Sequence, residues 1–180
     1  MLPLHHTPIV LFLRMQRYYF FRNYQNISVD FFKNTQKMRH NEAESNKNHY
    51  LCRLKDTLYI NMEQTKLLVE SITKGIQEKK GADIVVADLA EIDGTICRYF
   101  VICQGGSPNQ VEAIAESVSD FARNELGEKP VRVVGLENAQ WVAMDYTDVL
   151  VHIFLPDVRE YYDLEHLWHD ATLTYIPNLD

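Results

Sequence analysis

The stretch YFVICQGGSPNQVEAIAESVSDFA, residues 99–122, decides the fold because it joins a strand directly to a well-capped helix. Its apolar first half predicts a buried strand, and the two glycines that follow end it. Ser107 then suits the N-cap of a helix, Pro108 suits the first helical position, and Gln110 completes a capping box. Apolar residues at helical spacing predict the buried face of this helix: Val111, Ile114, Ala115, Val118, Phe121 and Ala122.

Further elements are predicted on both sides of this unit. Apolar periodicity predicts a helix over Glu63–Lys80, and strands are predicted over Ala82–Leu89, Arg98–Gln104, Pro130–Gly135, Trp141–Tyr146 and Asp148–Leu155. We expect a turn at Asp93-Gly94, short helices capped by Asp157 and Asp163, the second running through Leu164 and Trp168, and strand or coil from Thr172. The resulting fold class is α/β (α+β), with a mixed sheet of about five strands and flanking helices.

Charge divides the 180-residue chain into two parts. Residues 1–61 carry nine Lys/Arg against four Asp/Glu, whereas residues 62–180 carry nine against twenty-one. Residues 62–180 are therefore predicted to be the folded domain, and an acidic one. Phosphates would repel such a domain, so no direct readout of nucleic acid is expected, but a basic protein partner would suit it.

Residues 1–61 show no sustained period, and Asn34–Asn48 reads as disordered. Three interpretations compete for this stretch. It is translated upstream sequence with the true start at Met62, a transit peptide, or a genuine extension or secretion signal. The first is favoured because a clean helical pattern follows Met62, and the secretion signal is the weakest. We expect a cytoplasmic protein without a membrane span, or an organellar one if the stretch is a transit peptide.

Several residues invite a chemical interpretation. The Gly105-Gly106-Ser107 turn at a helix N-terminus suits phosphate, but it lacks the lysine of a P-loop, and a structural turn is favoured. Asp145, Asp148 and His152 suggest a metal or acid–base site, yet no Asp-x-Asp or Asp-x-Glu pair occurs in the predicted strands. A structural or interface role is therefore favoured for these three residues.

Cysteines and aromatic residues complete the set of candidates. Cys52, Cys97 and Cys103 form no CxxC and no disulfide framework, so a reducing compartment and inert thiols are expected. The aromatic residues near the C-terminus suit either interface anchors or the core, and the sequence leaves this choice open: Trp141, Tyr146, Tyr161, Tyr162 and Trp168.

Residues 62–180 contain a specific set of runs: YFVI (99–102), GGS (105–107), GL (135–136), WVAMDY (141–146), DVLVH (148–152) and REYYDLEHLW (159–168). With these runs, residues 62–180 resemble the ribosomal silencing factor (Iojap) family. This chain has Arg98 where the family usually has Asp, Gly106 where it has Asn, and Thr147 where it has Gly. The last difference concerns the turn geometry, because Thr accepts a positive φ poorly.

The resemblance implies a nucleotidyltransferase-like sheet without catalytic carboxylates, and a binding protein rather than an enzyme. It implies docking on large-subunit ribosomal protein fourteen, steric blocking of subunit joining and repression of translation under nutrient limitation. The alternatives are a large-subunit assembly factor and, less favoured, a nucleotidyltransferase-like enzyme.

The family motif also suggests which residues act. The implied contact residues are Trp141, Met144, Asp145, Tyr146 and Asp148. The implied supporting residues are His152, Tyr161 and Tyr162. No cofactor or metal is expected. A homodimer is compatible with a sheet domain of this size, but nothing in the sequence demonstrates one.

Overall fold

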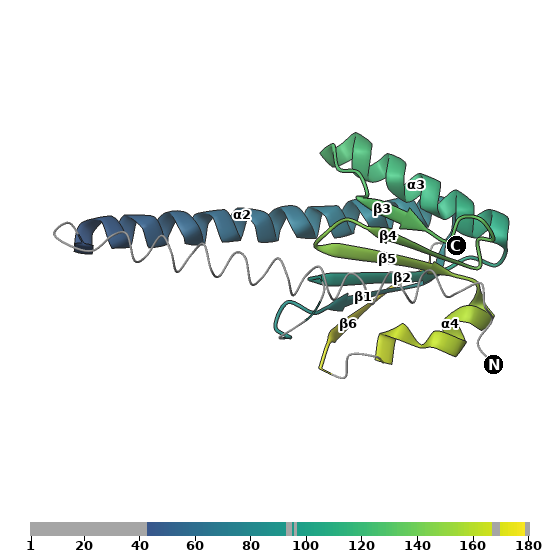
Figure 1. Cartoon of the computed structure of the whole chain (residues 1–180). Helices are drawn as coiled ribbons and strands as arrows, with labels where there is room; N and C mark the ends of the chain where they lie inside the picture. Colours follow the sequence, from purple (N-terminus) through teal and green to yellow (C-terminus); the bar gives the residue numbers. More distant parts are fainter. Residues whose placement is uncertain (1–42, 93–94, 96, 167–169, 179–180) are drawn as a thin grey trace.

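The chain folds into a mixed sheet with helices on both faces (Figure 1). In this computed structural model the described residues are 43–92, 95, 97–166 and 170–178. The predictions for residues 1–42, for the Asp93-Gly94 turn and for Trp168 lie outside the described residues. None of the described helices has the length and apolar character that crossing a membrane requires.

The sheet has six strands in the order β3-β4-β5-β2-β1-β6. Their bounds are β1 Ala82–Asp88, β2 Tyr99–Gln104, β3 Arg132–Val134, β4 Trp141–Asp145, β5 Val149–Phe154 and β6 Thr172–Ile176. Strands β2 and β5 pair in parallel, and every other neighbouring pair is antiparallel. The predicted mixed sheet is confirmed, with one strand more than expected. The extra strand is β6, which forms because five of its residues pair with β1.

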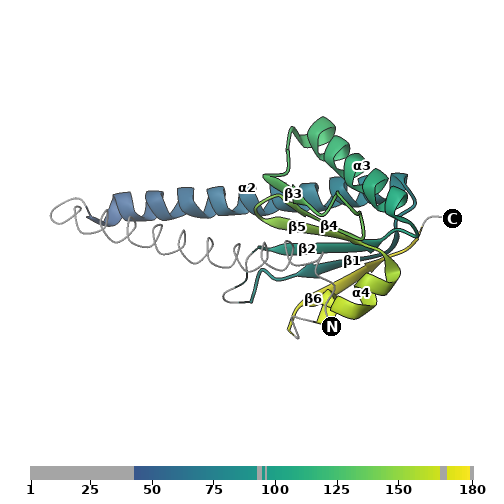
Figure 2. The ribbon, with the colours of Figure 1, turned by 45° about the vertical axis from the view of Figure 1, so that its right-hand side comes forward.

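Two layers of helices cover the two faces of the sheet (Figure 2). Helices α2 (Ala43–Glu78) and α3 (Pro108–Leu126) pack together on one face. Helix α4 (Pro156–Tyr162) and a 3₁₀ turn, Leu164–His166, lie on the other. The two long helices approach closely at Gly75, where an added Cβ would lie 2.8 Å from the Cα of Val118.

Side chains that alternate along each strand divide the core in two. The larger cluster, on the side of α2 and α3, includes Ile72, Val101 and Val151. The smaller cluster, on the side of α4, includes Phe100, Trp141 and Phe154. All six residues of β5 are buried, so the central strand is covered on both faces.

The local signals at α3 behave as predicted. The Ser107 hydroxyl accepts a hydrogen bond from the Gln110 amide at 3.2 Å, and the Gln110 side chain accepts one from the Gly106 amide at 2.8 Å. Gly127 ends the helix in the left-handed conformation, with φ of 73°.

Two predicted helix starts need correction. Helix α2 begins at Ala43 rather than Glu63, and so includes part of the segment predicted to be disordered. Residues 43–61 contain neither glycine nor proline, so no local signal interrupts the helix there. Helix α4 begins at Pro156, which suits the first turn, so Asp157 lies inside the helix instead of capping it.

Candidate functional site

The candidate site is the turn between β4 and β5, residues 145–148, which we call the 147 turn. The Tyr146 amide donates to the Val149 carbonyl at 2.9 Å, and the Asp148 amide donates to the Tyr146 carbonyl at 2.9 Å. An Asp145 carboxylate oxygen accepts from the Thr147 amide at 2.8 Å. These bonds hold Thr147 at φ of 73°, a left-handed conformation that a β-branched residue adopts only under strain.

Neighbouring segments extend the surface around the 147 turn. The Val131 amide donates to the Asp145 carbonyl at 2.7 Å, and the Val131 side chain is 74% exposed. On the other side, the Thr65 hydroxyl of α2 lies 3.4 Å from an Asp148 carboxylate oxygen. Met62, one helical turn before Thr65, is also exposed. The 147 turn therefore presents two carboxylates between exposed apolar side chains.

Val131 and Met62 were not identified from the sequence. Val131 reaches the 147 turn because β3 pairs with β4, with Arg132 opposite Asp145. Met62 lies near it because it precedes by one helical turn Thr65, whose hydroxyl is 3.4 Å from an Asp148 carboxylate oxygen. Neither residue belongs to a local motif, so only the strand pairing and helix packing identify them.

Three of the five predicted contact residues are buried, Met144 and Tyr146 beneath this surface and Trp141 at the other end of β4, where it pairs with Phe154. Trp141 is 1% exposed, Met144 is 0% exposed and Tyr146 is almost fully buried. This burial argues against Trp141 and Met144 touching a partner directly, because both are covered within the chain itself. Met144 and Tyr146 pack on the side of α2 and α3, and Trp141 packs on the side of α4. Asp145 and Asp148 do reach the surface.

Tyr146 fixes the 147 turn from below. Its hydroxyl lies near Ser119 and Arg123 of α3, and burial, the largest cause, raises the pKa of Tyr146 to about 12. The phenol therefore stays neutral at physiological pH, which suits an aromatic ring packed between a sheet and a helix.

His152 is fully buried in β5 on the same side of the sheet as Trp141. Its Nδ1 accepts a hydrogen bond from the Trp141 indole at 3.2 Å, which requires an unprotonated Nδ1. Its ring also lies 5.2 Å from that of Phe100. Burial lowers the pKa of His152 to about 3, so the imidazole is neutral at physiological pH. His152 thus holds Trp141 in place within the core.

Tyr161 and Tyr162 are not brought to the 147 turn. Both lie on α4, which follows the far end of β5. Tyr162 packs against Trp141 with ring centroids 4.7 Å apart, whereas Tyr161 is 59% exposed. Tyr162 therefore packs on Trp141 at the end of β4 away from the 147 turn, and Tyr161 forms part of a different surface.

The other chemical candidates are placed as follows. Amides at the start of α3 are bonded to the side chains of Ser107 and Gln110, which favours a structural role for the two glycines. Burial raises the pKa of Cys97, and it raises that of Cys103 to about 12, so both thiols are protonated. Within the described part of the chain, no three His, Cys, Asp or Glu residues gather as a metal site would require.

Comparison with known proteins identifies the family. The family model described as "Ribosomal silencing factor during starvation" matches residues 62–180. The chain belongs to this family. The ribosomal silencing factor of Bacillus subtilis is 39% identical over 108 residues, which cover 60% of this chain and 90% of the relative.

Solved structures and organellar relatives also match. A crystal structure of a Bacillus halodurans protein superposes with a TM-score of 0.52 at 33% identity, covering 62% of this chain and 98% of the other. The mouse protein named "Mitochondrial assembly of ribosomal large subunit protein 1" is 26% identical over 105 residues, covering 57% of this chain and 46% of the mouse protein. Maize "Protein Iojap, chloroplastic" is 33% identical over 110 residues, which cover 59% of this chain and 46% of the maize protein.

Buried His152 predicts a specific pH dependence of stability. In the unfolded chain His152 gains a proton near pH 6.5, whereas in the folded chain it stays neutral down to about pH 3. This contribution to stability is therefore complete above pH 6.5 and is lost as the pH falls toward 3. Between pH 7 and pH 5 it falls by about 2 kcal/mol. Urea unfolding at both pH values checks this, with His152→Asn as the non-titrating comparison. Equal pH dependence of the two proteins would contradict it.

The strain at Thr147 predicts that Thr147→Gly stabilises the fold. Glycine adopts a positive φ without steric strain, so we expect the free energy of unfolding to rise by about 1 kcal/mol. Glu137→Gly, at an exposed position without positive φ, is the matched control and should lower the free energy of unfolding. Thermal or urea unfolding measures both variants. A loss of stability in Thr147→Gly similar to that of the control would refute the strain.

Proposed function

We propose that this chain silences ribosomes by binding the large subunit through ribosomal protein fourteen and blocking its joining to the small subunit. The observation that carries this proposal is the family match over residues 62–180, whose description names ribosomal silencing during starvation. The chain would then repress translation when nutrients are short. Its site of action would be the cytoplasm, or an organelle if residues 1–61 direct import.

The 147 turn is the surface that best suits this partner. Half-buried Asp145 and exposed Asp148 are its charges, and residues 62–180 carry twelve more acidic than basic side chains. A basic ribosomal protein would be attracted to such a surface before contact and oriented on it. Val131 and Met62 would supply the apolar contact that charge alone does not provide.

The buried residues of the motif would act indirectly. Trp141, Met144 and Tyr146 fix the ends of β4 and β5, and the 147 turn depends on their packing. Truncating Trp141 would therefore disturb the core before it disturbed a contact. Variants of the exposed residues test the proposed surface more cleanly.

The proposed mechanism is steric. A folded body of about 13 kDa, bound where the two subunits meet, would occupy space that the small subunit needs. This mechanism requires no catalysis.

A second candidate function is assembly of the large subunit. It is favoured by the mouse relative, whose name assigns it to assembly of the mitochondrial large subunit. Both functions use a large-subunit partner, but they differ in which particle is bound. An assembly factor would associate with precursor particles, and a silencing factor with mature subunits.

Sucrose-gradient sedimentation with purified subunits tests the proposal. The chain should move with mature large subunits and reduce the joined-ribosome peak. Asp148→Lys should weaken the binding about tenfold, or about 1.4 kcal/mol, because it places a positive charge against a basic partner. Val131→Ser should weaken it without changing the charge.

Glu112→Lys is the matched control, because it makes the same charge change at an exposed position of α3. It should bind as the unaltered chain does. If Asp148→Lys and Glu112→Lys weaken binding equally, net charge rather than the 147 turn is responsible. Binding to precursors alone would favour the assembly function. If the chain binds neither particle but binds nucleoside triphosphate with Mg²⁺, the enzyme alternative gains support.

A further inference from the structure

The two edges of the sheet are protected to different degrees. Strand β3, at one edge, has three residues, includes Arg132 and follows Lys129 and Pro130. Short length, charge and proline are the usual means of preventing an edge strand from pairing with another chain. Strand β6, at the other edge, has five residues, TLTYI, with no charge and no proline.

Strand β6 pairs on one side only. Its five residues pair with β1, from Thr172 opposite Asp88 to Ile176 opposite Ile84. No described strand lies on its outer side. In an antiparallel pair every second residue points its amide and carbonyl away from the partner strand. The outer side of β6 is therefore a row of hydrogen-bonding groups available to an added strand.

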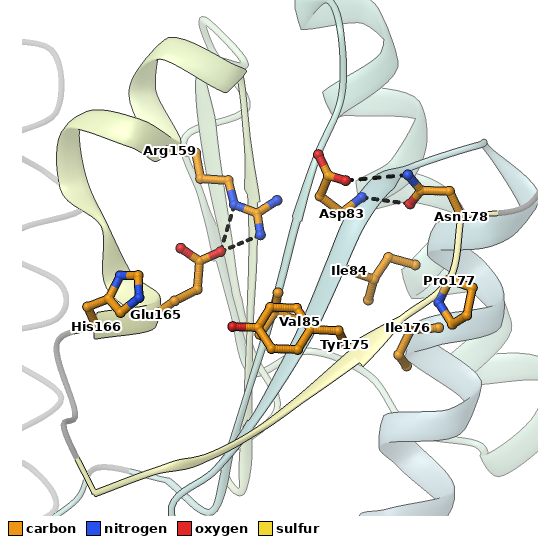
Figure 3. Close-up of a pocket in the computed structure, with 10 residues that line it drawn as sticks. All are labelled: Asp83, Ile84, Val85, Arg159, Glu165, His166, Tyr175, Ile176, Pro177 and Asn178. Carbon is orange, nitrogen blue, oxygen red and sulfur yellow. Dashed lines mark hydrogen bonds and ion pairs between the residues drawn. The ribbon is translucent and has the colours of Figure 1, made fainter.

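A hollow opens beside the end of β6 (Figure 3). It has a volume of about 500 Å³, and its lining includes Asp83, Val85, Arg159, Glu165, His166 and Tyr175. The Tyr175 side chain is 68% exposed, and Tyr175 pairs with Val85 across β1 and β6. In Figure 3 its ring overlaps Val85, and the Arg159–Glu165 ion pair lies above it. The hollow thus has an aromatic wall and a charged wall.

The structure fixes both polar sides of this hollow. Asp83 and Asn178 form a clasp in which the Asp83 amide donates to the Asn178 side chain at 2.8 Å. The Asn178 amide group donates back to the Asp83 carboxylate at 3.3 Å. Opposite, Glu165 accepts from the Arg159 guanidinium at 2.8 Å. Each carboxylate retains free lone pairs and can accept a further donor.

Negative charge dominates this region. A second hollow of about 450 Å³ lies across the Arg159–Glu165 pair and is also lined by Glu160 and Asp163. Together the two hollows contain four carboxylates against one guanidinium, and His166 adds a positive charge only when protonated. An ammonium or guanidinium group beside Tyr175 would meet the carboxylates of Asp83 and Glu165 and the face of the Tyr175 ring.

We infer that the β6 edge binds an extended Lys- or Arg-containing segment of a partner protein by strand addition, with one basic side chain in the hollow beside Tyr175. Backbone hydrogen bonds to β6 supply the affinity, and the charged hollow selects the sequence. A second copy of the chain fits this edge poorly, because pairing two β6 strands brings two acidic regions together.

This surface is separate from the 147 turn. The parallel strands β2 and β5 begin beside the 147 turn, at Tyr99 and Val149, and end at Gln104 and Phe154. The hollow lies at that second end, where Ala82 pairs with Gln104. The inference therefore does not rest on the proposed function, and either can fail alone.

A peptide titration tests the inference with the full chain. The probe is a fluorescently labelled acetyl-TKVKVKT-amide peptide, compared with acetyl-TEVEVET-amide. We expect the lysine peptide to bind at least about tenfold more tightly, and added salt to weaken it. Amide exchange measured by NMR should slow at residues 172–176 when the peptide is bound.

Two variants and their controls locate the site. Tyr175→Ala and Glu160→Lys should each weaken the lysine peptide about fivefold. Tyr161→Ala and Glu137→Lys make the same changes at exposed positions outside both hollows and should leave binding unchanged.

Three results would overturn the inference. Equal binding of the two peptides would rule out selection by charge. Binding without slowed exchange at residues 172–176 would rule out strand addition. A dimer seen by analytical ultracentrifugation that Tyr175→Ala dissociates would make a second copy the occupant of this edge.

Discussion

The parallel pairing of β2 with β5 is the interaction on which the rest of the structure depends. Six residue pairs join these central strands, and helices cover them on both faces. A parallel pair needs a long connection, and here α3, β3 and β4 supply it. That connection brings β4 back beside β5, so the 147 turn closes at the start of β5. The same pairing puts the hollow beside β6 and Tyr175 at the opposite end of the sheet.

Trp141 and His152 hold β4 against β5 on the face of the sheet that α4 covers. The two residues lie on neighbouring strands, because Trp141 of β4 pairs with Phe154 of β5, and Ala143 of β4 pairs with His152 of β5. The Trp141 indole donates a hydrogen bond to His152, whose imidazole is kept neutral by burial, and Tyr162 of α4 packs over the indole. Burial of this layer fixes β4 against β5, which allows the strained Thr147 to persist at the surface.

The sequence predicted features that depend on neighbouring residues. The start of helix α3 was predicted because Ser107, Pro108 and Gln110 act within its first turn. The central strands were predicted because continuous apolar runs indicate burial on both faces. The early start of α2 was missed, because its first residues carry no apolar period although nothing breaks the helix.

The remaining features depend on contacts between distant residues. Strand β6 becomes a strand only because β1 accepts it, so its own residues left strand and coil equally open. Trp141 was predicted as a contact residue because its motif implied one, but the later helix α4 covers it. Val131 joins the 147 turn through strand pairing, which no local pattern indicates. Exposure of a site residue is thus set by the fold rather than by its motif.

Hydrogen exchange of the chain, alone and bound to large ribosomal subunits, tests the central claim most directly. The claim is that the 147 turn is the docking surface. It predicts slower exchange on binding at the backbone amides of residues 145–148 and of Val131, with no change in α4. Unchanged exchange at these amides, with slowing confined to other elements, would contradict it.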